Sequence, residues 1–452
     1  MVRILSLFIY IISLFLITNC SFKNPGGFFD NRLEELEKEI TLKNTKLVFS
    51  KSKKFRKEIS GEVKINISKP IINENWTQKN LNINNEIPHL SYESKRQLIY
   101  KSRKIGKNKH DFKSFSFEPI ILNDNVIFYD TLGNIYNFSL NKNKILWRFN
   151  FYKKRYKNLP INIKLKYSNN NLIASDNLGY IYSLSISSGA LNWAKNYGIP
   201  FRSNLKIHNG YIFVLNQDNK YYFIKESNGD LQTSLDTFPS FLKTKQETNI
   251  SLDTDKGNIY FITSSGELYS INYRTGNINW LSTLLSVSSG VENKSSDLFF
   301  SSPIIYFNDN LFFSSSVSTF SINARNGVIN WELPFSTRIR PILSEDFIFL
   351  ASKDGFLINL NSKNGKVIWS TDIFKNNKKL KKKKVGDINS FILASNQILL
   401  STSKGFLIFL NYSDGKIINY IKVSGSGFFS NPIIVDKKLY IIDNKMRILI
   451  LN

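Results

Sequence analysis

The segment Gly355-Phe-Leu-Ile-Asn-Leu-Asn-Ser-Lys-Asn-Gly365-Lys-Val-Ile-Trp369 decides the fold, because its spacing of glycines and tryptophan returns along the chain. One glycine stands four residues before the tryptophan, and a second glycine stands ten residues before the first. The complete pattern occurs twice more, in Gly179, Gly189 and Trp193 and in Gly266, Gly276 and Trp280. Self-similarity at a fixed period indicates a repeat architecture, and it has to be interpreted before any local motif.

Other copies of the repeat keep only part of this pattern. Trp147 and Trp331 retain the tryptophan, whereas Thr233 and Asn419 stand where a tryptophan is expected. We call the position at which the repeat places its tryptophan the slot. The slots are residues 147, 193, 233, 280, 331, 369 and 419. The steps between them are 46, 40, 47, 51, 38 and 50 residues. Repeats of about 40–45 residues are typical of four-stranded propeller blades.

Within each repeat, the residue pattern predicts strands joined by tight turns. Apolar and polar residues alternate after Gly179, as expected for a half-buried strand. A second strand precedes Gly355, and the turn residues Lys353-Asp354-Gly355 predict a hairpin between the two. Glycine suits such turns because it accepts a positive φ, and Asn143 replaces it in one copy. The tryptophans are expected to be packing residues that cover the gap between neighbouring blades.

An eighth slot lies upstream of the seven. Residues 98–103 resemble the outer strand at residues 191–196, and Tyr100 stands 47 residues before Trp147. The chain ends with three further strands and lacks a fourth, which the strand around Tyr100 would supply. The sequence therefore predicts an all-β fold, an eight-bladed propeller of four-stranded antiparallel blades over residues 96–452, closed by this N-terminal strand. Seven blades are the alternative. The predicted blade-packing residues are Tyr100, Trp147, Trp193, Trp280, Trp331 and Trp369.

The N-terminus predicts secretion and a lipid anchor. The apolar run at residues 4–17 is too short to span a bilayer but suits a signal peptide. It leads to Cys20, the only cysteine, in a pattern that resembles a bacterial lipoprotein signal, although Asn19 departs from the usual small residue. We expect a signal peptide at residues 1–19, lipidation at Cys20, and a tether and lead-in at residues 20–95. Ser21 points to the outer membrane. An ordinary signal peptide with an incidental cysteine is the alternative.

The chain is strongly basic, with 61 Lys and Arg against 35 Asp and Glu and a formal net charge of +26. Such a charge would ordinarily indicate nucleic acid as a partner, which a secreted protein is not expected to meet. Seven lysines cluster at residues 375–384, between two slots. This cluster suits anionic lipid headgroups or an acidic partner. A codon bias that enriches lysine in a solvated loop is the alternative.

The sequence shows no catalytic or metal-binding motif. The three histidines, His89, His110 and His208, have no second histidine or cysteine at the spacing of metal ligands. Phosphate-binding loops, His-Glu-x-x-His helices and Gly-x-Ser-x-Gly elbows do not occur either. We therefore expect a binding scaffold rather than an enzyme, with no cofactor and no small-molecule substrate. Trp76 lies outside the blade register and is expected to pack the lead-in onto the propeller.

From about residue 96 to the end, the repeat resembles the pyrroloquinoline-quinone-type propeller repeat. Together with the lipoprotein signal and the eight slots, it is similar to the BamB family, the propeller lipoproteins of the outer-membrane β-barrel assembly (BAM) machinery. Residues 423–432 resemble the start of that family's last blade. The resemblance implies a lipid-anchored scaffold at the periplasmic face of the outer membrane. Such a scaffold binds the POTRA domains of the central barrel subunit BamA and assists the folding and insertion of outer-membrane proteins.

The resemblance also implies partner-binding residues in two loops. In the first loop, Phe241 and Leu242 correspond to the apolar contacts, and Lys243 or Lys245 to the cation. The family has an arginine there, and lysine does not reproduce its planar fork. In the second loop, Asp297 matches one of two acidic residues of the family. Ordinary inter-blade connections are the alternative for both loops.

Two other functions remain open at this point. A quinone-dependent dehydrogenase shares the repeat, but such enzymes resemble longer chains with an adjacent cysteine pair and calcium ligands. An envelope-anchored propeller with another protein client is the second possibility.

Overall fold

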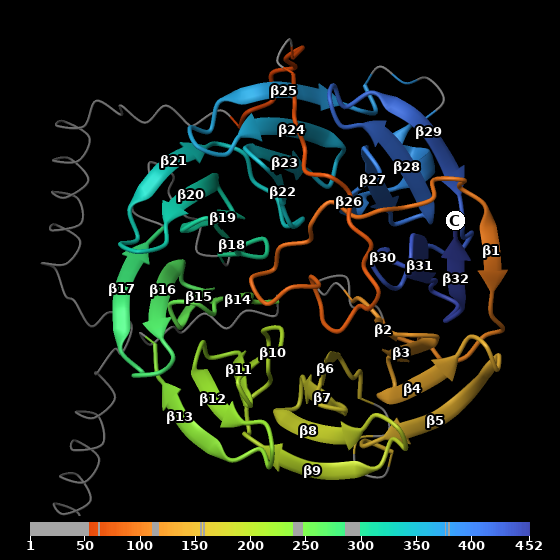
Figure 1. The fold of residues 1–452 in the computed structure, drawn as a ribbon, viewed down its shortest axis with the longest axis vertical. Coiled ribbons are helices and arrows are strands. Elements are labelled where there is room, and N and C mark those ends of the chain that lie inside the picture. Colours follow the sequence, from red (N-terminus) through yellow and green to blue (C-terminus); the bar gives the residue numbers. More distant parts are fainter. Residues whose placement is uncertain are drawn as a thin grey trace, which may run out of the picture. The chain divides into compact units, whose positions relative to one another are not determined.

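The computed structural model describes residues 54–61, 64–110, 117–153, 156, 159–237, 247–284, 299–375, 377 and 380–452. Over these residues the chain forms eight four-stranded antiparallel sheets, which are arranged as the blades of a closed ring (Figure 1). The predicted eight-bladed propeller is confirmed, and the alternative of seven blades is wrong. Within each blade the first strand is innermost and the fourth is outermost (Figure 1).

The strands follow one another in the same order in every blade. Blades one to four comprise β2 (Ile120–Leu122), β3 (Asn125–Tyr129), β4 (Asn134–Ser139) and β5 (Lys144–Asn150); β6 (Ile163–Ser168), β7 (Asn171–Asp176), β8 (Tyr180–Ser185) and β9 (Leu191–Asn196); β10 (Lys206–His208), β11 (Tyr211–Leu215), β12 (Tyr221–Lys225) and β13 (Leu231–Leu235); β14 (Ile250–Asp253), β15 (Asn258–Ile262), β16 (Glu267–Asn272) and β17 (Ile278–Thr283). Blades five to seven comprise β18 (Ile305–Phe307), β19 (Asn310–Ser314), β20 (Thr319–Asn323) and β21 (Ile329–Leu333); β22 (Ile342–Ser344), β23 (Phe347–Ala351), β24 (Phe356–Asn361) and β25 (Val367–Asp372); β26 (Ile388–Ala394), β27 (Gln397–Thr402), β28 (Phe406–Asn411) and β29 (Ile417–Lys422). Blade eight comprises β30 (Ile433–Val435), β31 (Lys438–Ile442), β32 (Ile448–Leu451) and β1 (Leu98–Lys101). A short helix, α3 (Lys382–Val385), lies between blades six and seven.

The ring has two faces that differ in their loops. The connection face carries the chain segments that join consecutive blades and the turns between second and third strands. The hairpin face carries the other turns of each blade, which join first to second and third to fourth strands. These assignments follow from the strand order, because successive strands of each blade are antiparallel.

Blade eight is built from both ends of the chain. Its strands lie in the order β30, β31, β32 and β1, and β1 pairs antiparallel with β32. Leu98 lies opposite Leu451, and Tyr100 lies opposite Ile450. The predicted closing strand is therefore confirmed. It gives the last blade its fourth strand, so the blade does not end on the apolar edge of β32.

The slot residues occupy the same register in their blades. Trp193 lies opposite Ser183 and Trp369 lies opposite Asn359, and in both pairs the register shifts at a β-bulge just before the tryptophan. Tyr100 also follows a register shift, between Leu98 and itself. The bulge brings the slot side chain to an equivalent place on each outermost strand.

Each slot tryptophan joins its blade to the next one. The indole N–H of Trp331 donates to the carbonyl of Ser362 at 2.7 Å, in the turn between the third and fourth strands of blade six. The equivalent bonds run from Trp147 to Ile186, from Trp193 to Glu226, from Trp280 to Ala324 and from Trp369 to Tyr412. Five of the blade-to-blade junctions thus share one hydrogen bond and one packing arrangement.

In five of the repeats the glycine before the slot has a second role besides its turn geometry, because it lies against the tryptophan of the preceding blade. Gly365 has a φ of +70°, and a Cβ at this position would lie only 2.8 Å from Trp331 of the preceding blade. Gly276 has a φ of +79°, but a Cβ there would meet no atom within 4 Å. The difference arises because the preceding slot is Thr233 instead of a tryptophan. The indole ring of Trp331 therefore occupies the space that a side chain at position 365 would need.

Blade eight differs from the other blades because no turn joins its third and fourth strands, and this explains why the slots next to it hold no tryptophan. Its third and fourth strands come from opposite ends of the chain, so no turn joins them. The preceding slot, at the residue opposite Phe409, is Asn419 and not a tryptophan. On the other side of blade eight, the Tyr100 hydroxyl donates to Asn143 Oδ1 at 2.8 Å. At the junction between blades eight and one, this bond between two side chains replaces the bond from an indole to a carbonyl that the five tryptophan junctions share.

We expect Gly365→Ala to lower the free energy of unfolding by about 2–5 kcal/mol, since alanine at positive φ costs about 1–2 kcal/mol and overpacking against Trp331 adds about 1–3 kcal/mol. Gly276→Ala is the matched control and carries the first cost alone. Equilibrium urea unfolding of both variants measures the difference. Equal losses in the two variants would show that the indole contact is energetically unimportant.

Candidate functional site

The first described residues lie on the outer edge of blade six. Ile59 and Ser370 of β25 exchange two backbone hydrogen bonds of 3.0 Å. Ile65 then packs in an apolar cluster with Phe349 of blade six and Phe391 of blade seven. The chain thus passes from the rim of the ring toward its axis between these two blades (Figure 1).

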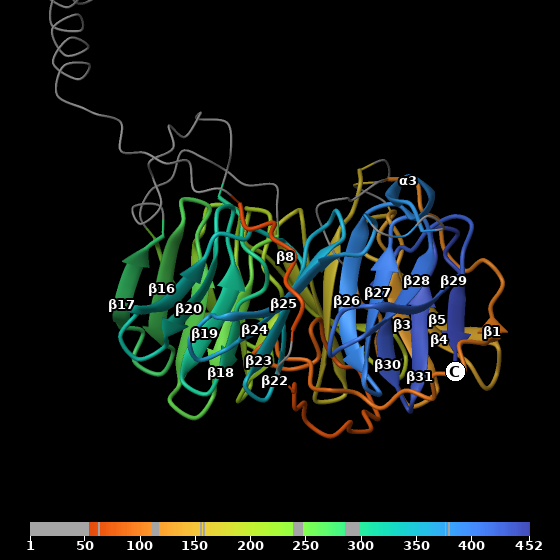
Figure 2. The same cartoon turned by 90° about the horizontal axis from the view of Figure 1, so that it is seen from above.

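Residues 64–95, here named the axial segment, lie within the ring of innermost strands (Figure 1). Figure 2 shows that part of this segment extends beyond the strand ends on one face. The axial segment forms hydrogen bonds with the innermost strand of every blade. In blade order, its partners are Ile121, Tyr167, Lys206, Ile250, Tyr306, Ser344, Leu393 and Ile434. It therefore joins all eight blades at the axis.

Trp76 is the largest buried contact of the axial segment. Its backbone exchanges two hydrogen bonds of 2.9 Å with Ile121, and its side chain is fully buried. The indole N–H donates to Glu118 Oε2 at 3.0 Å, and the same oxygen accepts the backbone N–H of Asn80 at 2.8 Å. Trp76 thus packs the lead-in onto the propeller, as expected. The sequence carried no signal for Glu118, which lies just before β2.

Asn85 joins two blades through a single amide group. Its Nδ2 donates to the carbonyls of Ile250 and Ile304, both at 2.8 Å, and the side chain is fully buried. Ile250 begins the innermost strand of blade four, and Ile304 directly precedes that of blade five. One asparagine therefore satisfies buried carbonyls that would otherwise lack a donor. Sequence reasoning missed Asn85, because asparagine is common throughout the lead-in.

His89 fixes the axial segment to blade seven. The ring is buried, with Nδ1 2.5 Å from the carbonyl of Ser68, and Nε2 accepts the backbone N–H of Asn396 at 3.0 Å. Because Nε2 is an acceptor, we assign the proton to Nδ1 and a neutral ring. Burial lowers the pKa of His89, and the bond to Ser68 opposes this effect. The histidine serves as a connector within the interior.

Several buried lysines lie near the axis. Lys206 is fully buried on β10 and donates from Nζ to the carbonyl of Asn82 at 3.0 Å. Its burial lowers the Lys206 pKa well below the ordinary value, and Lys166 nearby adds to this shift. Burial also lowers the pKa of Lys164 to about 8. The axial segment thus supplies an acceptor to the amine of Lys206, which the innermost strand of blade three buries.

A small cavity lies at the axis, beside Lys79 of the axial segment. The cavity there has a volume of about 20 Å³. Its lining residues are Lys79, Phe117, Glu118, Ile163, Lys164, Leu165, Asn204 and Leu205. Sites for organic ligands usually have volumes of about 300–1,000 Å³. The residues at this axial cavity therefore do not fit an organic cofactor while the axial segment occupies the ring.

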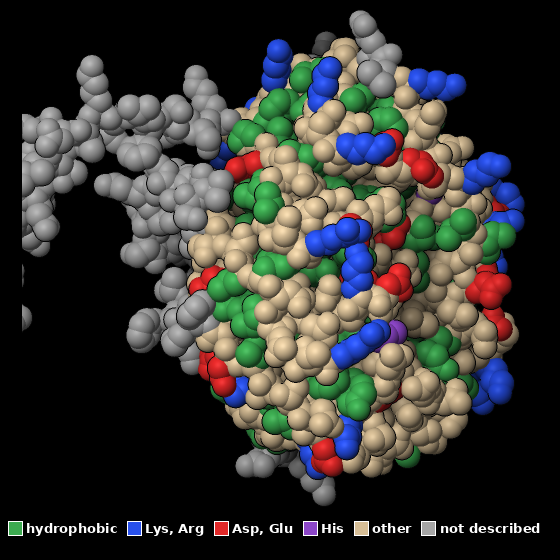
Figure 3. All heavy atoms as spheres, turned by 60° about the vertical axis from the view of Figure 1, so that its left-hand side comes forward, with side chains coloured by type: hydrophobic (Ala, Val, Ile, Leu, Met, Phe, Trp, Pro, Cys, Tyr) green, Lys and Arg blue, Asp and Glu red, His purple; other side chains and the backbone are tan. Residues whose placement is uncertain are grey.

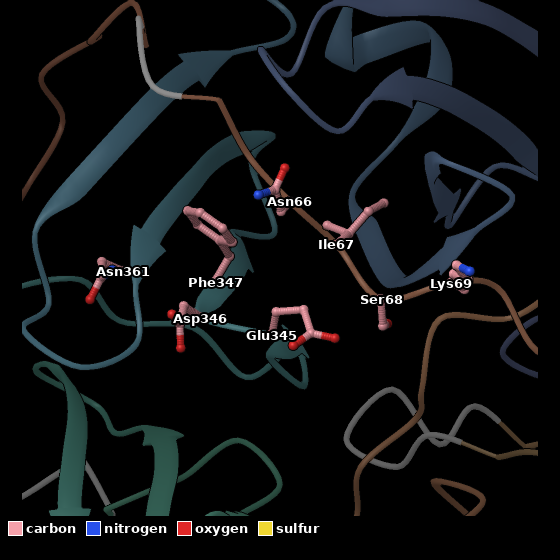
Figure 4. Close-up of a pocket in the computed structure, with 8 residues that line it drawn as sticks. All are labelled: Asn66, Ile67, Ser68, Lys69, Glu345, Asp346, Phe347 and Asn361. Carbon is pink, nitrogen blue, oxygen red and sulfur yellow. The ribbon is translucent and has the colours of Figure 1, made fainter.

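A larger groove opens on the hairpin face. It has a volume of about 510 Å³ and lies where the axial segment passes the turn between β22 and β23 (Figure 4). Its lining residues are Asn66, Ile67, Ser68, Lys69, Glu345, Asp346, Phe347 and Asn361. In Figure 4, Phe347 and Glu345 of blade six lie across from Ile67 and Ser68. Asp346 is paired with Lys363 at 2.8 Å.

The predicted partner-binding residues and the predicted lipidation site lie outside the described residues. These are Phe241, Leu242, Lys243, Lys245, Asp297 and Cys20. The loop with the first four connects β13 to β14, and the loop with Asp297 connects β17 to β18. The strand ends that these loops connect lie on the connection face, on either side of blade four.

Blade four and its neighbour carry exposed apolar side chains on their outermost strands. Ile278 and Leu281 of β17 are 47% and 37% exposed, and Leu231 of β13 is 49% exposed. Figure 3 shows apolar side chains between basic and acidic ones on this side of the ring. Aliphatic groups of this kind are suited to the centre of a protein contact with a charged rim.

The described residues contain no helix long and apolar enough to cross a membrane. Within the same part of the chain, no three side chains of His, Cys, Asp or Glu are grouped so that they could hold a metal ion.

A closed eight-bladed ring with tryptophan-to-turn junctions defines a propeller of the PQQ-like repeat class. The model of the family described as outer membrane protein assembly factor BamB matches residues 131–371, which is more than half of the chain. The chain belongs to this family. A search of curated protein sequences finds no match.

Solved structures with the same fold include BamB and two dehydrogenases. BamB from Moraxella catarrhalis is 14% identical, with a TM-score of 0.58 over 78% of this chain and 96% of that chain. A europium-containing methanol dehydrogenase is 12% identical, with a TM-score of 0.61 over 81% of this chain and 89% of that chain. The quinohemoprotein alcohol dehydrogenase of Comamonas testosteroni is 9% identical, with a TM-score of 0.59 over 81% of this chain and 76% of that chain. Identities this low show a shared fold alone.

Proposed function

We propose that the protein is a non-enzymatic scaffold lipoprotein of the outer-membrane β-barrel assembly complex. In this role it is anchored by a lipid on Cys20 at the periplasmic face of the outer membrane. It binds the POTRA domains of the central barrel subunit and assists the folding and insertion of outer-membrane proteins. The family match over residues 131–371 carries the proposal. The axial segment supports it, because the cavity of about 20 Å³ beside this segment is smaller than a cofactor site.

We propose that the partner binds on the connection face around blade four. Phe241 and Leu242 supply the apolar contacts, Lys243 or Lys245 the cation, and Asp297 an acidic contact from the second loop. Two observations support this location: both loops flank blade four, and its outermost strand exposes Ile278 and Leu281. A few apolar anchors inside a polar rim dominate the affinity of most protein contacts.

The second candidate is a quinone-dependent dehydrogenase, which the similarity to two solved dehydrogenases favours. An organic cofactor on the axis would require the axial segment to leave the ring. That displacement would break hydrogen bonds with all eight innermost strands. The scaffold proposal needs no such rearrangement.

The test is a mild-detergent pull-down of the tagged full-length protein from its native envelope, followed by mass spectrometry. We expect recovery of the barrel-forming subunit. Because loss of a hot-spot side chain costs about 2 kcal/mol or more, Phe241→Ala with Leu242→Ala is expected to reduce this recovery at least tenfold. Leu191→Ala with Ile418→Ala, at two exposed apolar residues on other blades, is the control and is expected to leave recovery unchanged.

Other results of the same experiment would overturn the proposal. Recovery of a different protein in place of the barrel subunit would indicate another client. Quinone absorbance in the purified protein would favour the dehydrogenase. Equal losses in the two double variants would contradict the contact at Phe241 and Leu242.

A further inference from the structure

Part of the lysine cluster between blades six and seven lies on the short helix α3, which buried apolar residues hold against the core. Lys381, Lys382, Lys383 and Lys384 are all exposed, and the last three belong to α3. Leu380 and Val385 on either side of these lysines are fully buried in the core between the blades. Two apolar anchors thus hold four consecutive lysines at one place on the connection face.

Neighbouring lysines extend this surface. We define the lysine face as Lys353, Lys375, Lys381, Lys382, Lys383, Lys384 and Lys404. Lys404 donates from Nζ to the carbonyl of Lys383 at 2.8 Å, and Lys353 and Lys382 share Asp387, each at 3.2 Å. Lys375 pairs with Glu58 at 3.0 Å. Among the described residues, two carboxylates are therefore paired with these seven lysines, so the face keeps a large positive excess.

The lysine face also lies where the described chain begins. Arg56 pairs with Asp354 at 2.6 Å, directly beside Lys353 in sequence. Glu58 pairs with Lys375. The beginning of the described chain is therefore paired with this face through Arg56 and Glu58.

We propose that the lysine face docks on an anionic phospholipid surface, on the membrane that holds the lipid anchor. This inference rests on the proposed function for the anchor. Each lysine near an anionic membrane surface strengthens binding by about fivefold. The anchor keeps the propeller close to the membrane, so even weak binding of the lysine face is effective. Docking holds the part of the connection face at blades six and seven against the lipid, and blade four lies elsewhere on the ring.

The experiment measures co-sedimentation with lipid vesicles. The protein is the chain from residue 20 with Cys20→Ser, which keeps every described residue and carries no lipid. The vesicles contain phosphatidylcholine alone, or phosphatidylcholine with about a third phosphatidylglycerol. In the test variant, Lys381, Lys382, Lys383 and Lys384 are changed to glutamine. The control variant has the same loss of charge at exposed lysines of the hairpin face, Lys142, Lys144, Lys366 and Lys437.

We expect the parent protein to bind the anionic vesicles and not the neutral ones. The test variant is expected to bind about 600-fold more weakly, at about fivefold for each of its four lysines. The control variant is expected to bind within about threefold of the parent, because its four lysines lie on the hairpin face, away from the lipid. Binding is expected to fall steeply with salt, because the Debye length shrinks to about 3 Å at 1 M.

Equal binding by the test variant and the parent would overturn the proposal, as would absence of vesicle binding. Equal loss in the control variant would show that net charge alone causes the binding. Melting curves check that both variants fold, which is expected because all eight lysines are exposed. The assay contains no partner protein, so its failure is distinguishable from failure of the scaffold proposal in the pull-down.

Discussion

Replacement of residues 96–106 by a Gly–Ser linker of equal length is expected to destabilise the ring and to cause aggregation. The change removes β1, whose pairing with β32 closes blade eight. It also removes the backbone bonds from Arg96 to Asn452, from Ser102 to Ile448 and from Ile105 to Met446. At about 1 kcal/mol for each lost hydrogen bond, the loss including the β1 ladder is about 5 kcal/mol. The apolar edge of β32 becomes free to pair with other chains.

Thermal melting and light scattering measure these two effects. Lys101→Ser is the control within the same strand, since Lys101 is exposed, and it is expected to behave like the parent. An unchanged melting temperature together with unchanged scattering in the linker variant would mean that β1 is dispensable for closure.

Trp76→Ala is expected to lower the free energy of unfolding by about 3–5 kcal/mol, as for other buried tryptophans. The change opens a cavity at the axis and removes the donor to Glu118 Oε2. Trp76→Phe keeps much of the volume without the N–H group and is expected to cost about 1–3 kcal/mol. Trp193→Ala is the comparison at the rim, where the indole is only partly buried and its loss is expected to cost less.

Denaturant unfolding ranks the three variants, and hydrogen exchange locates the effect. In Trp76→Ala, faster exchange is expected first in residues 64–95, because their bonds depend on this anchor. A cost for Trp76→Ala no greater than that for Trp193→Ala would contradict the importance of the axial segment for stability.

The blade count and the closing strand could be predicted because the repeat is a local signal. The distance from Gly355 to Trp369 is set by one strand and one turn, so it returns in every copy that keeps both. The closing strand could be predicted from the same repeat length, because Tyr100 stands 47 residues before Trp147. The second role of the glycines could not be predicted, since the indole that covers Gly365 comes from Trp331 in another blade.

The axial segment gave no comparable signal. Its composition is polar, as in a solvated tether, and its partners are far away in the sequence. Asn73, for example, binds the carbonyl of Ile434, which lies 361 residues further along the chain. Only Trp76 was singled out, because an isolated tryptophan outside the repeat requires burial. The proposed partner contacts at Phe241, Leu242 and Asp297 remain predictions, since they lie outside the described residues.

The axial segment and β1 also affect the order in which the molecule assembles. Both precede every complete blade in the chain, yet Leu90 binds Leu393 and Arg96 binds Asn452, the last residue. β1 therefore stays without its pairing partner until blade eight has been made. Contacts between such distant residues slow folding and lengthen the exposure of unpaired strands. Formation of blade eight, in which β32 pairs with β1, is therefore the step that completes the ring.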